Sequence, residues 1–313
     1  MASFFSLIRK HGLKLGLATF LGYVASYAAF YVGALILFLF PMMLIGPMML
    51  IGGVASVEDS LTPEAMVGFG VIGVILIILL YLVILALSCL VQAFINGGIF
   101  GMGKEILLEN RSDIGTFFTQ GFRYMWRLTG QYLLICLCWM PLYLLLVVPM
   151  VIAAELIGDW SLLILLPFLL VFLFLTMVLF SHAPAILVRG DLRVLESMKR
   201  IFRLFFSSSL GSICLSTLLA GVAALLVNMV FLIVAGLIIG FCILLQFLVH
   251  EGFVVLTIVA GIPLGLAYAV IVLPLSIAVA YLLILYRYER IRPKGLPELE
   301  SGGFSQSEDV IGR

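Results

Sequence analysis

Few residues in the long apolar stretches of this sequence could do chemistry. Asn228 lies in the middle of one stretch, while Gln92 and His182 lie near the ends of two others. Amide and imidazole groups donate and accept hydrogen bonds, so a cluster of them could bind or activate a substrate. We expect Asn228 to make one hydrogen bond to a neighbouring helix. A catalytic centre would require other polar groups to gather around Asn228, Gln92 or His182.

No catalytic motif accompanies these side chains. The sequence contains no GxSxG, HExxH or complete P-loop motif. None of its 3 histidines is spaced with cysteine or carboxylate residues as a zinc site requires. We therefore expect no enzymatic activity, no cofactor and no metal.

The elements that carry these residues follow from composition. Hydrophobic residues make up 64% of the 313 residues and charged residues only 11%, whereas globular domains carry about 25% charge. The apolar stretch at residues 15–53 alone exceeds the ~20 residues that cross a bilayer. The sequence therefore predicts an all-α integral membrane protein. Its net charge of +1 gives no reason to expect a nucleic-acid partner.

The distribution of charge sets the predicted topology. Six spans are expected, at residues 15–40, 66–95, 131–154, 162–181, 210–249 and 253–286. The 17 lysines and arginines fall within residues 9–14, 104–127, 189–203 and 287–313, whereas the alternate turns carry acids such as Glu58, Asp59 and Glu155. Six spans in three hairpins place every basic segment on one side, which the positive-inside rule assigns to the cytoplasm with both termini. We therefore expect a multi-pass protein of the cytoplasmic membrane.

Two outer apolar segments are longer than their spans need. Residues 41–53 contain PMMLIG twice in tandem, and the two prolines predict a bend. Residues 235–249 contain Gly236 and Gly240, where a helix could break. The sequence leaves open whether these segments are re-entrant, interfacial or extensions of the helices.

Three amphipathic helices are expected on the cytoplasmic side, one before each odd-numbered span. The clearest lies within residues 181–209, where apolar and polar residues separate on a helix. Its apolar stripe comprises Val194, Leu195, Met198, Ile201, Phe202 and Phe205. Its opposite face comprises Arg193, Glu196, Ser197, Lys199, Arg200 and Arg203. We expect this helix to lie in the membrane interface with the stripe toward the acyl chains.

Weaker versions precede the first and third spans. The first carries Ile8 and Arg9, and the second follows Asp113, a favourable N-cap. The second has a stripe of Ile114, Phe117, Phe118, Gly121, Phe122 and Met125, with Gln120, Arg123 and Arg127 facing away. Tyr124 and Trp126 suit the aromatic belt at the interface. Upstream, the glycine-rich residues 96–103 are expected to lead the chain out of the membrane.

Seven basic residues of these helices are the candidates for contact with anionic lipid headgroups or a protein partner. They are Arg9, Arg123, Arg127, Arg193, Lys199, Arg200 and Arg203. Each basic residue near an anionic surface contributes about 1 kcal/mol. Topology and anchoring alone would also explain these charges.

The order of amphipathic helix, span, acidic turn and span recurs along the chain. We expect one transmembrane domain over residues 1–295, and a three-unit repeat over residues 3–96, 113–182 and 191–287 is one explanation of the recurrence. Similar amphipathic helices could also arise independently. The polar tail at residues 296–313 is predicted to be disordered.

Two stretches carry a resemblance to a known group of proteins. They are NGGIFGMGKEILLENRSDIGTFFTQGFRYMWRLTG at residues 96–130 and APAILVRGDLRVLESMKRIFRLFF at residues 183–206. The chain resembles, over residues 4–292, poorly characterised prokaryotic six-span proteins related to the membrane domain of some glycerophosphoryl diester phosphodiesterases. The resemblance implies an all-helical membrane module. It implies no active site, because catalysis in those enzymes belongs to a separate soluble domain without a counterpart here.

The predicted function is a non-catalytic membrane module that organises lipid or a membrane or cytoplasmic protein partner, as an accessory to transport or envelope biogenesis. The alternative is a transporter or exporter of an apolar or amphiphilic substrate, which requires a cavity in the core. An intramembrane enzyme is the third interpretation.

Overall fold

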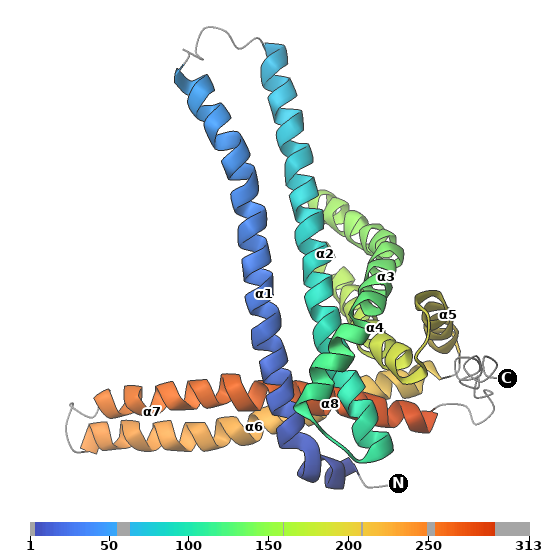
Figure 1. Ribbon diagram of the computed structural model, residues 1–313, viewed down its shortest axis with the longest axis vertical. Coiled ribbons are helices and arrows are strands. Elements are labelled where there is room, and N and C mark those ends of the chain that lie inside the picture. The colour runs from blue at the N-terminus through green and yellow to red at the C-terminus, as the bar shows by residue number, and fades with distance from the viewer. Residues whose placement is uncertain (1–3, 55–62, 159, 208, 249–253, 292–313) are drawn as a thin grey trace, which may run out of the picture.

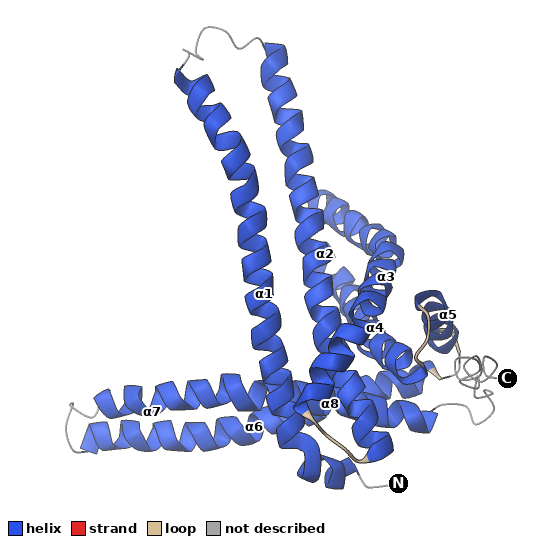
Figure 2. Ribbon diagram, in the orientation of Figure 1, coloured by secondary structure: helices blue, strands red, loops and turns tan. Residues whose placement is uncertain are grey.

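The computed structural model describes residues 4–54, 63–158, 160–207, 209–248 and 254–291, and every regular element within these ranges is a helix (Figures 1 and 2). The elements are α1 (Phe4–Val54), α2 (Pro63–Glu109), α3 (Ile114–Ile157), α4 (Trp160–Gly190), α5 (Val194–Phe205), α6 (Leu210–Leu248), α7 (Val254–Ala267), the π-helix η2 (Tyr268–Val272) and α8 (Leu273–Ile291). The predicted acidic turn at Glu58 and Asp59 and the tail at residues 296–313 lie outside the described residues.

Within the described residues, six helical stretches are long and apolar enough to cross a membrane. They are Phe4–Leu37, Ile78–Glu109, Ile114–Ile152, Leu166–Gly190, Leu210–Phe247 and Thr257–Glu289. The all-α, six-span prediction is confirmed. These helices indicate an integral membrane protein.

The outer apolar segments are extensions of the helices. Helix α1 continues through Pro41 and Pro47 to Val54, and α6 continues through Gly236 and Gly240 to Leu248. The 51 residues of α1 span roughly 75 Å at 1.5 Å per residue, more than twice a hydrocarbon core of about 30 Å. Of the three alternatives, the structure therefore shows an extension of the helix, and the bend predicted at the PMMLIG repeat stays a prediction.

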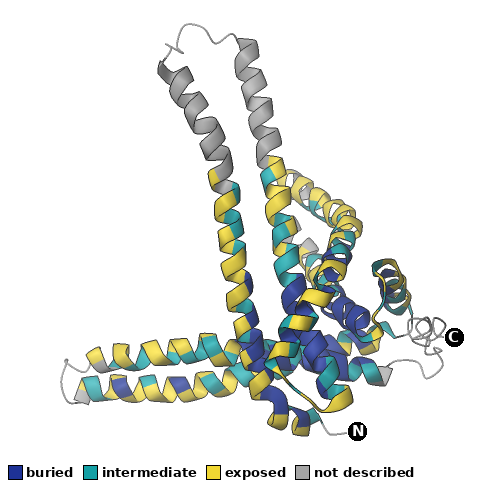
Figure 3. Ribbon diagram, in the orientation of Figure 1, coloured by how far each residue is buried: buried dark blue, intermediate teal, exposed yellow. Residues whose placement is uncertain are grey.

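The buried residues gather where the N-terminal end of α1 and the C-terminal end of α8 meet two basic turns (Figure 3). These turns join α2 to α3 and α4 to α5. Helix α2 is the centre of this region, since residues 93–103 are all buried. Beyond it the α1–α2 and α6–α7 hairpins project in different directions and expose apolar side chains such as Leu35, Leu82 and Leu237 (Figures 1 and 3). Side chains of this kind are suited to contact with lipid.

Helix α2 packs most extensively on α3. Six buried positions of α3 alternate spacings of four and three as in the seam of a coiled coil, namely Phe117, Gly121, Tyr124, Leu128, Gln131 and Ile135. Thr129 and Tyr132, which lie beside this seam, are also buried. A methyl group at Gly97 would lie 3.3 Å from the carbonyl oxygen of Gly121. The two backbones therefore approach each other where both residues lack a side chain.

The ring of Phe117 lies between two glycines on different helices. A methyl group at Gly98 of α2 would lie 2.7 Å from this ring, and one at Gly22 of α1 would also overlap it. These glycines allow three helices to meet around one aromatic side chain. Residues 96–103 are helical, because α2 continues without a break to Glu109. The prediction that they lead the chain out of the membrane stays a prediction.

The first two predicted amphipathic helices are the opening turns of α1 and α3, and only the third is a separate helix. The prediction assigned two residues of the second amphipathic helix, which forms the opening turns of α3, to the wrong face. Phe122, expected in the stripe, is 62% exposed, while Tyr124, expected in the aromatic belt, is 1% exposed. The seam toward α2 follows a seven-residue repeat rather than the stripe, and this repeat selects Tyr124.

Most of the predicted apolar stripe of α5 packs on other helices of the protein, whereas the sequence predicted that it faces lipid. Met198, Ile201 and Phe205 are buried in the core with residues of α3 and α4. Leu195, in contrast, is 68% exposed. Ser197, predicted on the polar face, is fully buried, because its hydroxyl accepts a hydrogen bond of 2.6 Å from Gln131 Nε2.

The last span is not a single α-helix. The π-helix η2 interrupts it immediately after the GIPLG sequence and ends just before Pro274. A π-turn adds a residue to one turn and commonly occurs at functional sites. In this span the π-helix is a change of helical pitch between α7 and α8 rather than a break in the helix.

Candidate functional site

A cavity of about 600 Å³ opens between helices of all three hairpins. Its walls come from α2, α3, α4, α6 and α8, and most of its lining is apolar. The apolar lining includes Met177, Phe180, Ala220, Ala224, Ile277 and Ile284. This size falls in the range of small-molecule sites, about 300–1,000 Å³.

One part of the cavity lining is a chain of hydrogen-bonded polar side chains. Gln92 Nε2 donates to Asn96 Oδ1 at 3.3 Å, and Asn96 Nδ2 donates to Tyr132 Oη at 2.5 Å. Asn96 and Tyr132 are buried. Because the Tyr132 hydroxyl accepts in this chain, its own proton remains available to donate. The chain can therefore offer a donor to a polar group that enters the cavity.

The sequence contained a signal for this chain. Gln92 and Asn96 are four residues apart, so they share one face of α2 and line the same wall. Tyr132 carried no signal of its own. Only the packing of α3 on α2 brings its hydroxyl to Asn96.

A second polar group comes from α4 and α6. Ser181 and Thr217 line the cavity, and His182 is buried behind them. His182 Nδ1 lies 3.1 Å from the carbonyl oxygen of Val178, 3.3 Å from Ser181 Oγ and 3.4 Å from Thr217 Oγ1. Since a carbonyl oxygen only accepts, Nδ1 carries the proton, and the buried acceptor Nε2 has no partner among the described residues.

Polar groups thus gather around Gln92 and beside His182, as an intramembrane site requires, but not around Asn228. Asn228 is half-buried on α6, and its Nδ2 donates at 2.7 Å to the carbonyl oxygen of Ala224 in the same helix. The contact to a neighbouring helix expected of Asn228 is therefore replaced by one within α6. Asn228 is not among the residues that line the cavity.

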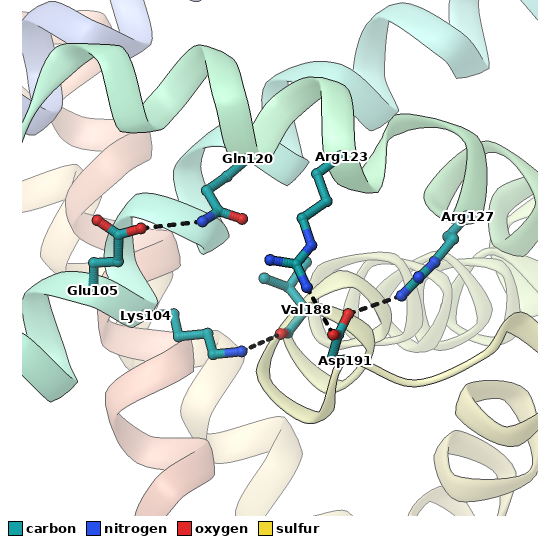
Figure 4. A network of polar contacts seen from close by, with 7 residues as sticks. All are labelled: Lys104, Glu105, Gln120, Arg123, Arg127, Val188 and Asp191. Atoms are coloured by element: carbon teal, nitrogen blue, oxygen red, sulfur yellow. Dashed lines mark hydrogen bonds and ion pairs between the residues drawn. The ribbon is translucent and has the colours of Figure 1, made fainter. Parts of the chain in front are cut away.

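Two of the seven predicted headgroup contacts are paired within the protein. Arg123 Nη2 and Arg127 Nη1 lie 2.9 and 2.8 Å from the two carboxylate oxygens of Asp191 (Figure 4). Nearby, Lys104 Nζ donates to the carbonyl oxygen of Val188 and Gln120 donates to Glu105 (Figure 4). These side chains hold α2, α3 and the end of α4 together, so part of their role is structural.

The end of α4 explains how Asp191 reaches both arginines. Asp191 has φ +46°, and Leu192 N–H donates at 3.1 Å to the carbonyl oxygen of Leu187. This is the Schellman arrangement, with the left-handed residue just past the helix end. Arg123 and Arg127 are four residues apart and share one face of α3, so both reach the same carboxylate.

The other predicted headgroup contacts remain on the surface. Arg9, Arg193, Lys199 and Arg203 are exposed and Arg200 is half-exposed. None of the five is in the ion pairs found among the described residues, which join Arg123 and Arg127 to Asp191 and Arg189 to Glu289. Their predicted role therefore stays a prediction.

Within the described residues, no three or more histidine, cysteine, aspartate or glutamate side chains gather as a metal site would require. Comparisons of the chain with models of protein families, with curated proteins and with solved structures find no match. The resemblance to six-span proteins related to a phosphodiesterase membrane domain consequently stays a prediction.

Proposed function

We propose that this integral membrane protein binds a lipid or another amphiphile in the cavity between α2, α3, α4, α6 and α8, and acts as a non-catalytic module that presents it to a partner. The cavity carries this proposal, because apolar walls beside the Gln92–Asn96–Tyr132 chain match an apolar molecule with one polar group. No aspartate, glutamate, lysine, arginine or histidine is among its lining residues, which favours binding over acid–base catalysis.

A substitution that fills the cavity tests the proposal. Ala224 lines the cavity, whereas the neighbouring Leu225 is exposed on the outside of α6. Ala224→Phe should lower the amount of lipid that copurifies per mole of protein, measured by native mass spectrometry and lipid extraction. Leu225→Phe adds an aromatic ring on the outer face and should leave that amount unchanged. Equal lipid content in the wild type and both variants would refute binding in the cavity.

Transport of an amphiphile is the second candidate function. It is favoured by the position of the cavity between the roots of different hairpins, one of which contains the π-helix η2. In proteoliposomes, transport predicts that the wild type moves a fluorescent amphiphile between leaflets or across the membrane and that Ala224→Phe does not. Lipid binding without such movement would favour the accessory role.

We also propose that the protein lies in the cytoplasmic membrane of a prokaryote with its basic side in the cytoplasm. Support comes from the convergence of the N-terminal part of α1, the α2–α3 turn and the end of α4 at one end of the molecule (Figure 1). The positive-inside rule assigns that side to the cytoplasm. We likewise propose that the chain is related to the six-span proteins that are themselves related to the membrane domain of some glycerophosphoryl diester phosphodiesterases.

A further inference from the structure

A second cavity, of about 480 Å³, lies among the charged residues at the basic end of the molecule. Helix α1 contributes Lys10, His11 and Lys14 to it, and the turn between α2 and α3 contributes residues 110–113. It shares no lining residue with the membrane cavity. We call it the basic pocket.

The basic pocket has an excess of positive charge. Lys10, Lys14 and Arg111 line it, against the single carboxylate of Asp113. None of the three cations takes part in the ion pairs found among the described residues. Their charge is therefore available to an anion from outside the chain, and lysine and arginine side chains are the usual ligands of phosphate.

His11 holds the pocket in shape. It is 5% exposed, its Nε2 lies 2.8 Å from Asn110 Oδ1, and its Nδ1 lies 2.7 Å from Ser112 Oγ. Asn110 adopts a left-handed backbone with φ +55°, which ends α2 and turns the chain back. The buried His11 ring thus forms hydrogen bonds with the residues on both sides of Arg111. The turn is therefore ordered before a ligand binds, so binding costs little conformational entropy.

The surface of α1 next to the pocket is apolar. Leu13 is 75% exposed and Leu17 is 44% exposed, and both lie three residues from a pocket lysine on the same face of the helix. An acyl chain could follow this surface away from a phosphate held by Lys10, Lys14 and Arg111.

From this arrangement we propose that the basic pocket binds a phosphate-bearing anion, either a phospholipid headgroup or a soluble phosphate compound. The pocket lies outside the membrane cavity, so this inference does not depend on the proposed function. The ligand is recognised by three cations set around a turn that His11 organises.

Binding of dioctanoyl phosphatidate to the purified full-length protein in detergent tests the proposal. The triple variant K10Q/K14Q/R111Q should weaken binding by at least about tenfold, because charge-assisted hydrogen bonds to the phosphate are lost. The variant R292Q/K294Q/R313Q removes the same number of positive charges from residues after α8 that are not among those lining the pocket, and it should change the Kd by less than about twofold. Equal weakening in both variants, or none in the pocket variant, would overturn the proposal.

His11→Phe separates a shaped pocket from a mere concentration of charge. It keeps all three cations and removes the two hydrogen bonds to Asn110 and Ser112. Weaker phosphatidate binding supports the pocket, and unchanged binding overturns the role given to His11. Size-exclusion chromatography and thermal unfolding in detergent verify that each variant is folded.

Competition identifies the source of the phosphate. Displacement of phosphatidate by inorganic phosphate or glycerol phosphate at similar concentrations indicates a soluble ligand, and failure of both to displace it indicates a lipid. Dioctanoyl glycerol has the same chains without phosphate and should not compete at this pocket. If it displaces phosphatidate equally well, the phosphate is not what is recognised and the proposal is overturned.

Discussion

At the scale of single residues, the membrane cavity depends on polar groups that are buried only where they have partners. Asn96 satisfies its amide through Gln92 and Tyr132, and the Tyr132 ring in turn packs in the core against Phe180 at 5.7 Å between centroids. A buried polar group that loses its partner keeps its desolvation cost. The residues that shape the cavity are therefore also residues that stabilise the fold.

Tyr132→Phe should lower stability although it removes only one oxygen. The Asn96 amide loses its acceptor in a buried site, which costs about 1–3 kcal/mol. Thermal unfolding in detergent should show a lower Tm, and the amount of copurified lipid should fall if the Tyr132 hydroxyl contacts it. Tyr143→Phe on the exposed part of α3 is the matched control and should leave the Tm unchanged. A Tm equal to wild type in both variants would contradict the role of Tyr132.

Asp191→Asn should lower the free energy of unfolding by less than Tyr132→Phe does. Asparagine accepts the left-handed backbone at this position, so the substitution removes the charge and leaves the Schellman turn intact. Exposed ion pairs contribute about 0.2–1 kcal/mol each, and added salt should shrink the difference from wild type. Glu196→Gln on α5 is the control, because Glu196 is exposed and in none of the ion pairs found among the described residues. A large loss of stability that does not depend on salt would show that Asp191 acts through more than charge.

At the scale of the elements, glycine decides where helices meet. Gly97, Gly101 and Gly121 lie in the contact between α2 and α3. Phe117 fills the space that Gly22 and Gly98 leave. Gly236 and Gly240 of α6 form a GxxxG pair, but a methyl group added at either would meet no atom of the described residues within 4 Å. A GxxxG pattern therefore does not by itself mark a packed surface in this protein.

Gly98→Ala tests this packing. The added methyl group would lie 2.7 Å from the Phe117 ring, and overpacking of this kind costs about 1–3 kcal/mol. The Tm in detergent should fall, and the second substitution Phe117→Leu should recover part of the loss by making room. Gly236→Ala adds the same methyl group in open space and should not destabilise the protein. If both alanine variants had the same Tm, the close approach of α2 to α1 and α3 would be refuted.

At the scale of the whole molecule, the basic end is compact and the hairpins extend from it. Helices α2, α3, α4 and α8 pack together there, while the exposed apolar residues lie along the hairpins (Figure 3). Both cavities lie among elements of this packed region. A partner or ligand that binds there contacts several hairpins at once.

Cysteine accessibility tests the proposed threading of the whole molecule. In a background without the native cysteines, Arg200→Cys should react with a membrane-impermeant maleimide only after the cells are opened. Glu155→Cys, at the exposed far end of α3, should react in intact cells. The reverse pattern would place the basic end outside and overturn the proposed orientation.

The sequence by itself determined the class and the number of spans, because both depend on local quantities. A bilayer needs about 20 apolar residues per helix, and that length is readable from each stretch alone. It also identified α5 as amphipathic. None of these features depends on what a distant part of the chain does.

Only the tertiary structure decided which polar and apolar side chains meet. Tyr124 and Ser197 are buried and Phe122 and Leu195 are exposed, against the pattern of their own helices, because α2 and α3 present partners that the pattern does not contain. Tyr132 reaches Asn96, and His11 reaches Asn110 and Ser112, across long separations in sequence. Both cavities are made by such contacts, since several helices must close around each one.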